Sequence, residues 1–508
     1  MNLLRFASLI FASVFAGPLM LSSERPNVVL IHVDDLGPEH LACYGGDVLT
    51  PNIDSLAEFG AKLTRYYTPS AVCSPSRYNL LTGRYASRCV DFAKQFPDKS
   101  EPAFIRWNAF LEGSEETVAH SFNRVGYATA LIGKHHNTRN ERFQEKLPTG
   151  ADPRSPEEAK RMLGNYERVV EEVKRGTGFQ EVSRLYVNNL HTLDLDEELH
   201  QHNPEWITEG GLDFIERHKA EPFFLYLAHT VPHGPSPLAS LKSSPKITPS
   251  GFLDEAPQVQ PSRQDVLRRV DEAGLPESAA PLTWLDDSVG AVLDKLKAED
   301  LEENTIVIFI SDHCGKGKLT CYDDGTRTPA LIRWPSRIRA GIEIDAITSS
   351  IDWVPTFMEV CGLRRDDSYL VDGANLMPLF DGEEESVRLS LFLEIAYTKA
   401  VVTEDWKYIA TRFPTRIQKE ITPENRHLYN HEGEKATWDA IAGMVSVRYG
   451  TDKRHPGLFD DDQLYYLPDD PGEGQNLASQ PEKAGTLKKM KRILNSYTQE
   501  FQNRFGEF

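Results

Sequence analysis

Apolar runs of strand length alternate with amphipathic runs of helix length over most of the chain. Nearly continuous apolar runs at residues 26–33, 127–132, 223–228 and 305–310 predict buried strands. Amphipathic periodicity predicts helices at residues 51–62, 115–125, 207–219 and 281–297, the first with Thr50 as N-cap and Pro51 at its first position. This alternation predicts an α/β fold with a large, mostly parallel sheet sandwiched by helices.

The pattern changes beyond about residue 385. Shorter alternating segments at residues 400–403, 406–410 and 463–467 predict antiparallel strands, and residues 481–501 predict a polar terminal helix. We therefore predict a large α/β domain over residues 25–385 and a smaller α+β subdomain, built on an antiparallel sheet, over residues 386–508. Residues 236–262 are rich in proline and serine, and we expect a long surface loop there, near the functional site.

The first 24 residues predict a secretory signal peptide. One basic residue, Arg5, precedes an apolar run over residues 6–21, and small residues follow. The run is short for a membrane span, and no later stretch approaches the roughly 20 apolar residues that a spanning helix needs. We expect a secreted or periplasmic protein with no membrane span.

Composition and charge narrow the function classes. The chain has 508 residues, of which 40% are hydrophobic, and a net charge of -20 from 56 basic and 76 acidic residues. Such a charge repels polyanions, so we expect no nucleic-acid partner, although a few convergent cations can still hold a small anion. The six cysteines are too few for a disulfide scaffold. Cys314 and Cys321 are close enough to pair, and their spacing is equally compatible with two free thiols.

Ionisable residues follow every predicted strand of the large domain. Because the carboxyl ends of parallel strands meet at one edge of a sheet, these residues predict a shared site there. A single aspartate or histidine at such a position commonly has a structural role in a turn, but four strand ends carry such groups together. They are Asp34 and Asp35, Lys134 and His136, His233, and Asp312 and His313.

Four of these residues indicate a metal site. Asp34, Asp35, Asp312 and His313 form a hard, mostly oxygen-bearing set that suits Ca²⁺ or Mg²⁺ better than a soft metal. The sequence contains neither a Cys-x-x-Cys pair nor a His-Glu-x-x-His motif, which disfavours zinc.

Cys73-Ser74-Pro75-Ser76-Arg77, followed by residues 78–84 (YNLLTGR), resembles the signature of the type I sulfatases, a family of the alkaline phosphatase-like superfamily. Residues 133–136 (GKHH) resemble the family's Gly-Lys-x-His, residues 232–235 (PHGP) its Pro-His-x-Pro, and residues 322–329 (YDDGTRTP) the segment that follows its second lysine. The similarity runs from about residue 26 to 478. In that family, a maturation enzyme oxidises the cysteine of the signature to formylglycine.

The resemblance implies a mechanism for these residues. One hydroxyl of hydrated formylglycine at position 73 would attack sulfur, and deprotonation of the other by His136 would release sulfate. Arg77 would hold the formylglycine, while Lys134 and Lys318 would neutralise the sulfate. His233 would contact the sulfate or protonate the departing oxygen, and Lys318 competes for the latter role. One calcium ion would be held by Asp34, Asp35, Asp312, His313 and an oxygen of converted Cys73.

The chain departs from the family pattern in two places. His135 stands where the family commonly has tryptophan, and we expect His135 or Asn137 to face the substrate. The segment after His313 is shorter than usual, so Lys316 rivals Lys318 for the sulfate contact.

The resemblance and the predicted export favour a sulfate ester on a sulfated carbohydrate or polysaccharide as substrate. The alternatives are a small aryl sulfate, or a phosphate or phosphonate ester hydrolysed on the same fold. A non-catalytic binding protein would require Cys73 to remain a thiol. Polar residues in predicted loops are either substrate contacts or ordinary surface: Arg139, His191, His202 and Trp206.

Overall fold

A computed structural model describes residues 25–111, 113–139, 148, 150–190, 197–234, 236–366, 369–422, 424–425, 429, 451–501 and 503–506. The predicted signal peptide, His191 and Pro235 lie outside the described residues.

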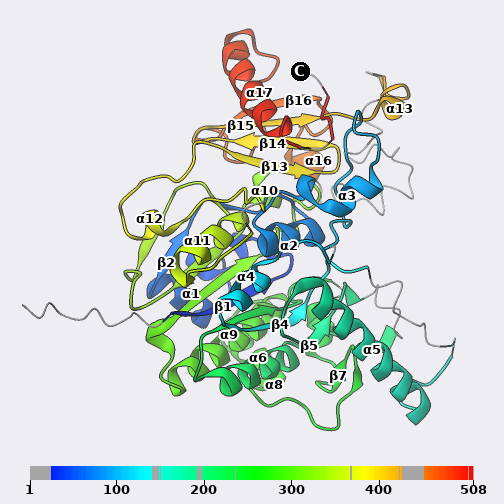
Figure 1. Cartoon of the computed structure of the whole chain (residues 1–508), viewed down its shortest axis with the longest axis vertical. Helices are drawn as coiled ribbons and strands as arrows, with labels where there is room; N and C mark the ends of the chain where they lie inside the picture. Colours follow the sequence, from blue (N-terminus) through cyan, green and yellow to red (C-terminus); the bar gives the residue numbers. More distant parts are fainter. Residues whose placement is uncertain are drawn as a thin grey trace, which may run out of the picture.

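An eight-stranded sheet forms the centre of the large domain (Figure 1). Five neighbouring strands are parallel: β9 (Thr305–Ser311), β1 (Asn27–Val33), β6 (Phe223–Ala228), β4 (Ala128–Lys134) and β5 (Glu181–Tyr186). Beyond β9, β10 (Ala330–Arg333) runs antiparallel to β9 and β2 (Ala61–Leu63), and β11 (Ile342–Ile344) pairs in parallel with β2. The predicted large, mostly parallel sheet is confirmed.

Alternating side chains of β6 pack against helices on opposite faces of the sheet. On one face, the ring of Phe224 stacks at 4.4 Å on Phe122 of α4 (Val118–Arg124) and contacts Phe357 of α11 (Trp353–Cys361). On the other face, Leu227 lies against Gly211 of α6 (Pro204–His218), where an added Cβ would meet it at 3.1 Å. Helix α6 packs on α9 (Ala280–Ala298), which also contacts α1 (Pro51–Glu58).

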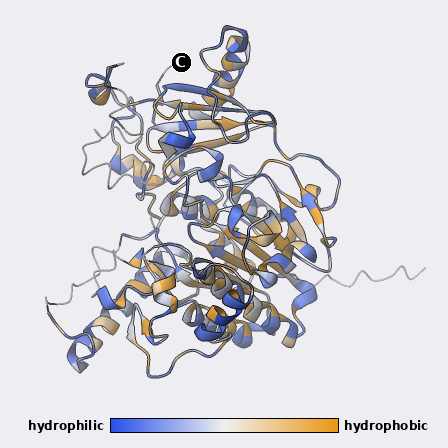
Figure 2. Ribbon diagram, turned by 180° about the vertical axis from the view of Figure 1, so that it is seen from behind, coloured by the Kyte–Doolittle hydropathy of each residue, from blue (hydrophilic) through white to orange (hydrophobic). Residues whose placement is uncertain are grey.

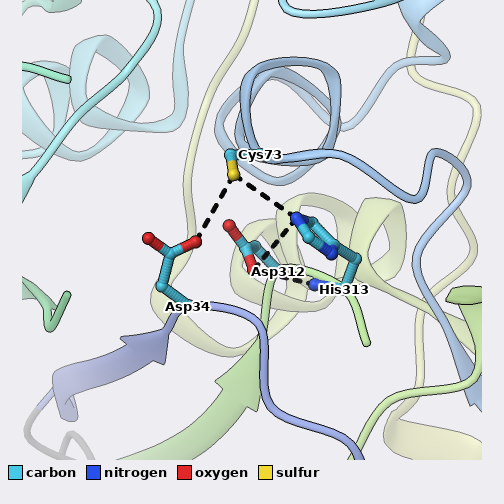
Figure 3. A group of neighbouring side chains, drawn as sticks. All are labelled: Asp34, Cys73, Asp312 and His313. Atoms are coloured by element: carbon cyan, nitrogen blue, oxygen red, sulfur yellow. Dashed lines mark hydrogen bonds and ion pairs between the residues drawn. The ribbon is translucent and has the colours of Figure 1, made fainter. Parts of the chain in front are cut away.

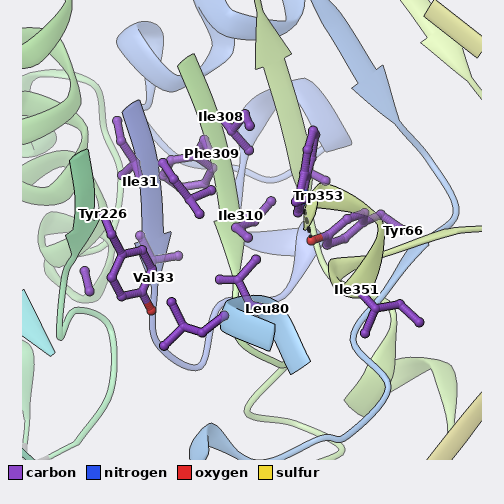
Figure 4. Packing of buried hydrophobic residues seen from close by; sticks show 14 of the residues in the cluster. Ile31, Val33, Tyr66, Leu80, Tyr226, Ile308, Phe309, Ile310, Ile351 and Trp353 are labelled. Atoms are coloured by element: carbon purple, nitrogen blue, oxygen red, sulfur yellow. Dashed lines mark hydrogen bonds between the residues drawn. The ribbon is translucent and has the colours of Figure 1, made fainter. Parts of the chain in front are cut away.

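Side chains of the strands at the centre of the sheet form much of the hydrophobic core. Every residue of β1, β6 and β9 is buried, because both faces of these strands are covered (Figure 4). Burying one such Val, Ile or Phe side chain stabilises the fold by roughly 1.5–3 kcal/mol. The strands are correspondingly hydrophobic in Figure 2, whereas the outer helices and loops show much more hydrophilic surface.

A second, four-stranded sheet follows and is antiparallel throughout. Its strands are β13 (Leu391–Ile395), β14 (Thr398–Val402), β15 (Trp406–Thr411) and β16 (Asp462–Tyr466), and α17 (Ala484–Thr498) packs on β14 and β15. The predicted small antiparallel subdomain with a terminal helix is thus confirmed, while the boundary at residue 385 stays a prediction.

Two predictions about local structure were wrong. The helix expected over residues 51–62 ends at Glu58, since residues 61–63 pair as β2 with two other strands. Thr50 occupies the N-cap position without capping; the carboxylate of Asp286 accepts the backbone N–H of Ile53 at 2.8 Å instead. Residues 236–262 contain regular structure, namely α7 (Pro237–Leu241), which Ser236 caps, and the pair β7 (Ile247–Thr248) and β8 (Gly251–Phe252).

The remaining elements complete the frame. They are α2 (Cys73–Thr82), α3 (Val90–Gln95), α5 (Pro156–Thr177), α8 (Arg263–Glu272), α10 (Asp323–Thr326), α12 (Met377–Phe380), α13 (Thr415–Gln418), α16 (Thr451–Arg454), β3 (Tyr66–Tyr67) and β12 (Thr348–Ser349). All six cysteines are described, and all are free thiols, Cys314 and Cys321 included. In the described part of the chain, none of the helices is both long and apolar enough to cross a membrane.

Candidate active site

The ionisable residues predicted at the strand ends converge on the first residue of α2. Figure 3 shows Asp34, from the end of β1, and Asp312 and His313, from the end of β9, gathered below Cys73. Ligand-type atoms of these four residues lie within 4.8 Å of one another. A second group with overlapping members adds Asp35 and His233. The carboxyl edge of the parallel sheet therefore carries the site.

Cys73 is completely buried in a positively charged environment. Its Sγ lies 3.4 Å from Asp34 Oδ1 and 3.3 Å from His313 Nε2. Burial alone would raise the pKa of the thiol, but Lys134, Lys318 and His313 outweigh it and hold that pKa well below its ordinary value. A group at this position is therefore stabilised in an anionic form.

Hydrogen bonds between the ends of β1 and β9 fix Asp35 and Asp312. Asp312 N–H donates to Val33 O at 3.0 Å, and Asp35 N–H donates to Asp312 Oδ1 at 3.0 Å. Asp35 adopts a left-handed backbone conformation with φ of 66°, uncommon for a residue with a side chain. Burial, followed by the nearby charge of Asp34, raises the pKa of Asp312 well above its ordinary value. A bound cation would offset this concentration of buried carboxylates.

Arg77 connects three elements beneath Cys73. The residue lies one helical turn further along α2 and is fully buried. Its guanidinium donates to Asp312 Oδ2 at 3.3 Å, to the Tyr226 hydroxyl at 3.2 Å and to the Lys134 carbonyl at 3.1 Å. A planar guanidinium can satisfy these divergent acceptors together, whereas an ammonium is a more compact charge on a flexible stem.

Two buried lysines reach the site from different segments. Lys134 ends β4, where Gly133 (φ 101°) allows the close approach of Ala228 O that an added Cβ would meet at 2.0 Å. The Lys134 ammonium donates to Asp34 Oδ2. Lys318 Nζ lies 2.9 Å from Asp35 Oδ1 and 3.9 Å from Cys73 Sγ, while Lys316 is exposed.

The pKa values of His233 and His136 shift in opposite directions. His233 Nε2 lies 3.3 Å from Lys318 Nζ and 3.6 Å from Asp35 Oδ2. Burial opposes protonation of His233, but Asp35 and Asp34 outweigh it and raise its pKa. His136 is buried beside Cys73, and burial lowers its pKa to about 4 despite a hydrogen bond with Cys73. Near neutral pH, His136 is therefore a proton acceptor and His233 the better donor.

Four of the residues expected to contact the substrate are buried, and a fifth forms an ion pair. His135 and Asn137 are fully buried, and Asn137 Nδ2 donates to the carbonyls of Ser74 and Ala109 at 2.7 Å, which supports the start of α2. His202 and Trp206 are buried as well, Trp206 inside α6. Arg139 pairs with Asp91 at 2.6 Å and its guanidinium lies 4.4 Å from the Phe110 ring centroid.

Two residues at the site were not predicted. Tyr226, whose hydroxyl joins His32 and Arg77, sits inside an apolar strand and carries no sequence signal. Asn189 Oδ1 accepts a hydrogen bond from Lys134 at 2.5 Å. Asn189 comes shortly after β5, so the rule about strand ends would have found it had β5 been predicted.

Comparisons with known proteins agree with this geometry. The family model described as "Sulfatase" matches residues 26–363, and one described as "N-sulphoglucosamine sulphohydrolase, C-terminal" matches residues 312–420. The N-acetylgalactosamine-6-O-sulfatase of Bacteroides thetaiotaomicron is 25% identical over 90% of this chain and 91% of its own length. Human arylsulfatase A is 30% identical over 75% of this chain and 72% of its own length.

A solved structure of a protein in complex with its substrate, D-glucosamine-2-N,6-O-disulfate, matches with a TM-score of 0.59 at 19% identity. The match covers 94% of this chain and 98% of that one, which shows a shared fold. The sulfatase family model covers more than half of the present chain. The chain therefore belongs to the sulfatase family, the type I sulfatases of the alkaline phosphatase-like superfamily, and is a sulfuric ester hydrolase.

Proposed function

We propose that the protein hydrolyses a sulfate ester of a sulfated carbohydrate, using formylglycine made from Cys73 and one bound calcium ion. The main observation in support is that Cys73 lies between a group of carboxylates and a group of cationic side chains. Metal ligands and an anion-binding pocket are what attack on a sulfate ester requires.

The residues present fit calcium. Asp34, Asp35 and Asp312 supply hard oxygen donors from two adjoining strand ends, and His313 lies 3.1 Å from Asp35. Burial, and after it the charge of Asp34, raises the pKa of Asp312, and a divalent cation would favour the ionised carboxylate there. When bound, calcium would supply positive charge next to position 73 and the sulfate. An oxygen at position 73 would complete the ligand set.

A hydrated aldehyde at position 73 would supply the nucleophilic hydroxyl. Arg77 pairs with the aspartates and would hold the formylglycine one helical turn before it. Lys134 and Lys318, which reach the site as ammonium groups, would bind and orient the sulfate. These contacts would strengthen as negative charge develops on the sulfate oxygens.

Two histidines would move the protons. The lowered pKa of His136, about 4, leaves its imidazole neutral and able to take a proton from position 73. The raised pKa of His233 favours an imidazolium that can protonate the departing alcohol. The raised pKa of Lys318 makes that lysine a poorer proton donor, which supports His233 for the acid role.

The carbohydrate substrate is supported by the relatives, one named for N-acetylgalactosamine-6-O-sulfate chemistry and one bound to a glucosamine disulfate. The 30% identity to arylsulfatase A favours a small aryl sulfate as the second candidate. A phosphate or phosphonate ester is the third candidate substrate. We further propose that the protein is exported, to the periplasm or outside the cell, and that a formylglycine-generating enzyme acts on Cys73.

Mass spectrometry of the peptide that contains residue 73 tests the modification. We expect the mass of formylglycine after expression with a maturation enzyme and the mass of cysteine without one. Cys73→Ser should abolish turnover while the protein stays folded. Full sulfatase activity of that variant would refute the mechanism.

Released sulfate measured across defined sulfated saccharides, 4-nitrophenyl sulfate and the matched phosphate esters tests the substrate class. We expect turnover to be fastest on a sulfated saccharide. Faster hydrolysis of the aryl sulfate, or of the phosphate esters, would replace the carbohydrate proposal with the corresponding alternative.

A further inference from the structure

Asn189 reaches the site by an extension of the pairing between β4 and β5. Beyond the last ladder pair, Lys134 with Tyr186, the backbone N–H of His135 donates to Tyr186 O and that of His136 to Val187 O, both at 3.0 Å. The segment after β5 therefore runs beside the segment that carries His136. Asn189, stabilised by a hydrogen bond from its own N–H to Asn188 Oδ1 at 2.7 Å, follows directly on this path.

The ammonium of Lys134 lies between two acceptors. One is Asp34 Oδ2 and the other is Asn189 Oδ1, at 2.5 Å. Lys134 is 1% exposed, whereas Asn189 is half-buried, so Asn189 lies on the more open side of the ammonium. An ammonium has three N–H donors. Asp34 and Asn189 accept two of the three N–H donors of Lys134. The third N–H is left for a sulfate oxygen, and the first two fix its direction.

The neutrality of Asn189 matters as much as its position. Asp34 alone would hold Lys134 by charge, but Asp34 is shared with Cys73 at 3.4 Å and with Arg77 at 3.8 Å. A second carboxylate beside Lys134 would cancel the positive charge that attracts the sulfate. The amide oxygen restricts the ammonium without adding negative charge to the anion pocket.

We infer that Asn189 is a positioning residue that directs the Lys134 ammonium at the sulfate group. The inference rests on the proposed sulfatase function, because it assigns Lys134 a sulfate contact. Removal of the amide would take away the second acceptor, so the Lys134 ammonium could rotate about its hydrogen bond to Asp34 and its other donors would no longer point in a fixed direction.

A double-mutant cycle tests the inference on the matured enzyme, with initial rates on 4-nitrophenyl sulfate. Asn189→Ala should lower kcat/KM by about tenfold, the effect of one hydrogen bond to a charged group. In a Lys134→Ala background, the same change should lower kcat/KM by less than about twofold, because the group that Asn189 positions is gone. Equal losses in both backgrounds, or no loss in either, would overturn the inference. A wild-type enzyme without sulfatase activity would instead contradict the proposed function before any variant is compared.

A second measurement needs no activity. In crystal structures of the unconverted protein, Asn189→Ala should displace the Lys134 ammonium, whereas Asn189→Asp, which keeps an oxygen acceptor, should retain its position. The matured Asn189→Asp enzyme should still show a raised KM, because the new charge repels the sulfate. An ammonium that stays in place in Asn189→Ala would show that Asn189 does not position Lys134.

Discussion

Lys318 is the lysine whose role the sequence left most open, and its burial separates it from Lys316. Lys318 Nζ lies within 4 Å of Cys73, Asp35 and His233, while Lys316 is exposed. Lys318→Ala should lower kcat/KM by about 100-fold, as is typical for the loss of one group that stabilises charge in a transition state. Lys316→Ala, assayed on the same substrate, should change it by less than about twofold. A larger effect of Lys316→Ala would reverse the assignment.

Arg77 is as important for stability as for binding. Its guanidinium is fully buried and pairs with Asp312 and Asp34. Arg77→Met should lower the free energy of unfolding by about 3–5 kcal/mol, because it leaves buried carboxylates without a partner. Urea denaturation measures this loss. Arg175→Met is the matched control: Arg175 is exposed and pairs with Glu172, so we expect a change of less than about 1 kcal/mol. Similar losses in both variants would contradict the argument.

At the scale of elements, α16 and the residue after it, in the C-terminal subdomain, support the segment that carries Lys318. Tyr322 stacks on His455, with ring centroids 3.7 Å apart. Arg454 donates to Asp324 at 2.7 Å and to the carbonyl of Lys316 at 2.8 Å. The antiparallel sheet borders the large domain near α2 and α10 in Figure 1. The subdomain therefore stabilises one wall of the active site.

A buried carboxylate in this contact should make stability depend on pH. Glu473 lies 2.8 Å from Lys407, and burial raises its pKa to about 7 from an ordinary 4.5, although Lys407 opposes the shift. Between these values the folded state binds more protons than the unfolded state, so stability falls as pH rises. Glu473→Gln should reduce the loss between pH 4.5 and 7 by about 3 kcal/mol. Urea denaturation at both pH values measures this difference.

The control for this prediction is Glu482→Gln, which changes an exposed glutamate of the same subdomain. We expect it to leave the pH dependence of stability as in the wild type. If Glu473→Gln and Glu482→Gln gave the same pH dependence, the pKa of Glu473 would not be raised in the folded protein.

At the scale of the whole molecule, long apolar runs predicted the parallel sheet, and the polar residues that follow them predicted the site. Asp34, Lys134, His233 and Asp312 were placed correctly near Cys73, because parallel strands bring their carboxyl ends to one edge. The wrong helix end and the missed strand β5 both depend on tertiary contacts. Residues 61–63 leave a helical pattern to pair with other strands, and β5, a sheet edge with polar positions, has no continuous apolar run.

Polar residues beside Lys134 also have a structural role that the local sequence did not indicate. His135 lies inside the motif of residues 133–136 and Asn137 follows it; both are buried, and Asn137 donates to the Ser74 carbonyl at the start of α2. A substrate contact by His135 or Asn137 stays a prediction. Asn189 was missed because the strand that precedes it was missed. Polar residues next to a motif can therefore support the backbone of the site as readily as they contact substrate.

The proposed metal ligands come from separate parts of the fold, so metal binding should stabilise the whole molecule. Asp34 and Asp35 follow β1, Asp312 follows β9 and residue 73 begins α2, so unfolding separates the ligands. A ligand that binds only the folded state stabilises it by about 4 kcal/mol at 1,000 times its Kd. In the Cys73→Ser protein, which removes any variation in conversion, calcium added after EGTA treatment should raise Tm by several degrees.

Asp312→Asn in the same background should remove this response, because it takes away one of the clustered carboxylates. Asp213→Asn, which changes an exposed carboxylate on α6 whose side chain is 56% exposed, should retain it. Differential scanning calorimetry with calcium, and with magnesium in parallel, measures the shift. A calcium response that persists in Asp312→Asn would locate the ion elsewhere. A larger response to magnesium would favour a smaller, octahedral ion over calcium at these carboxylates.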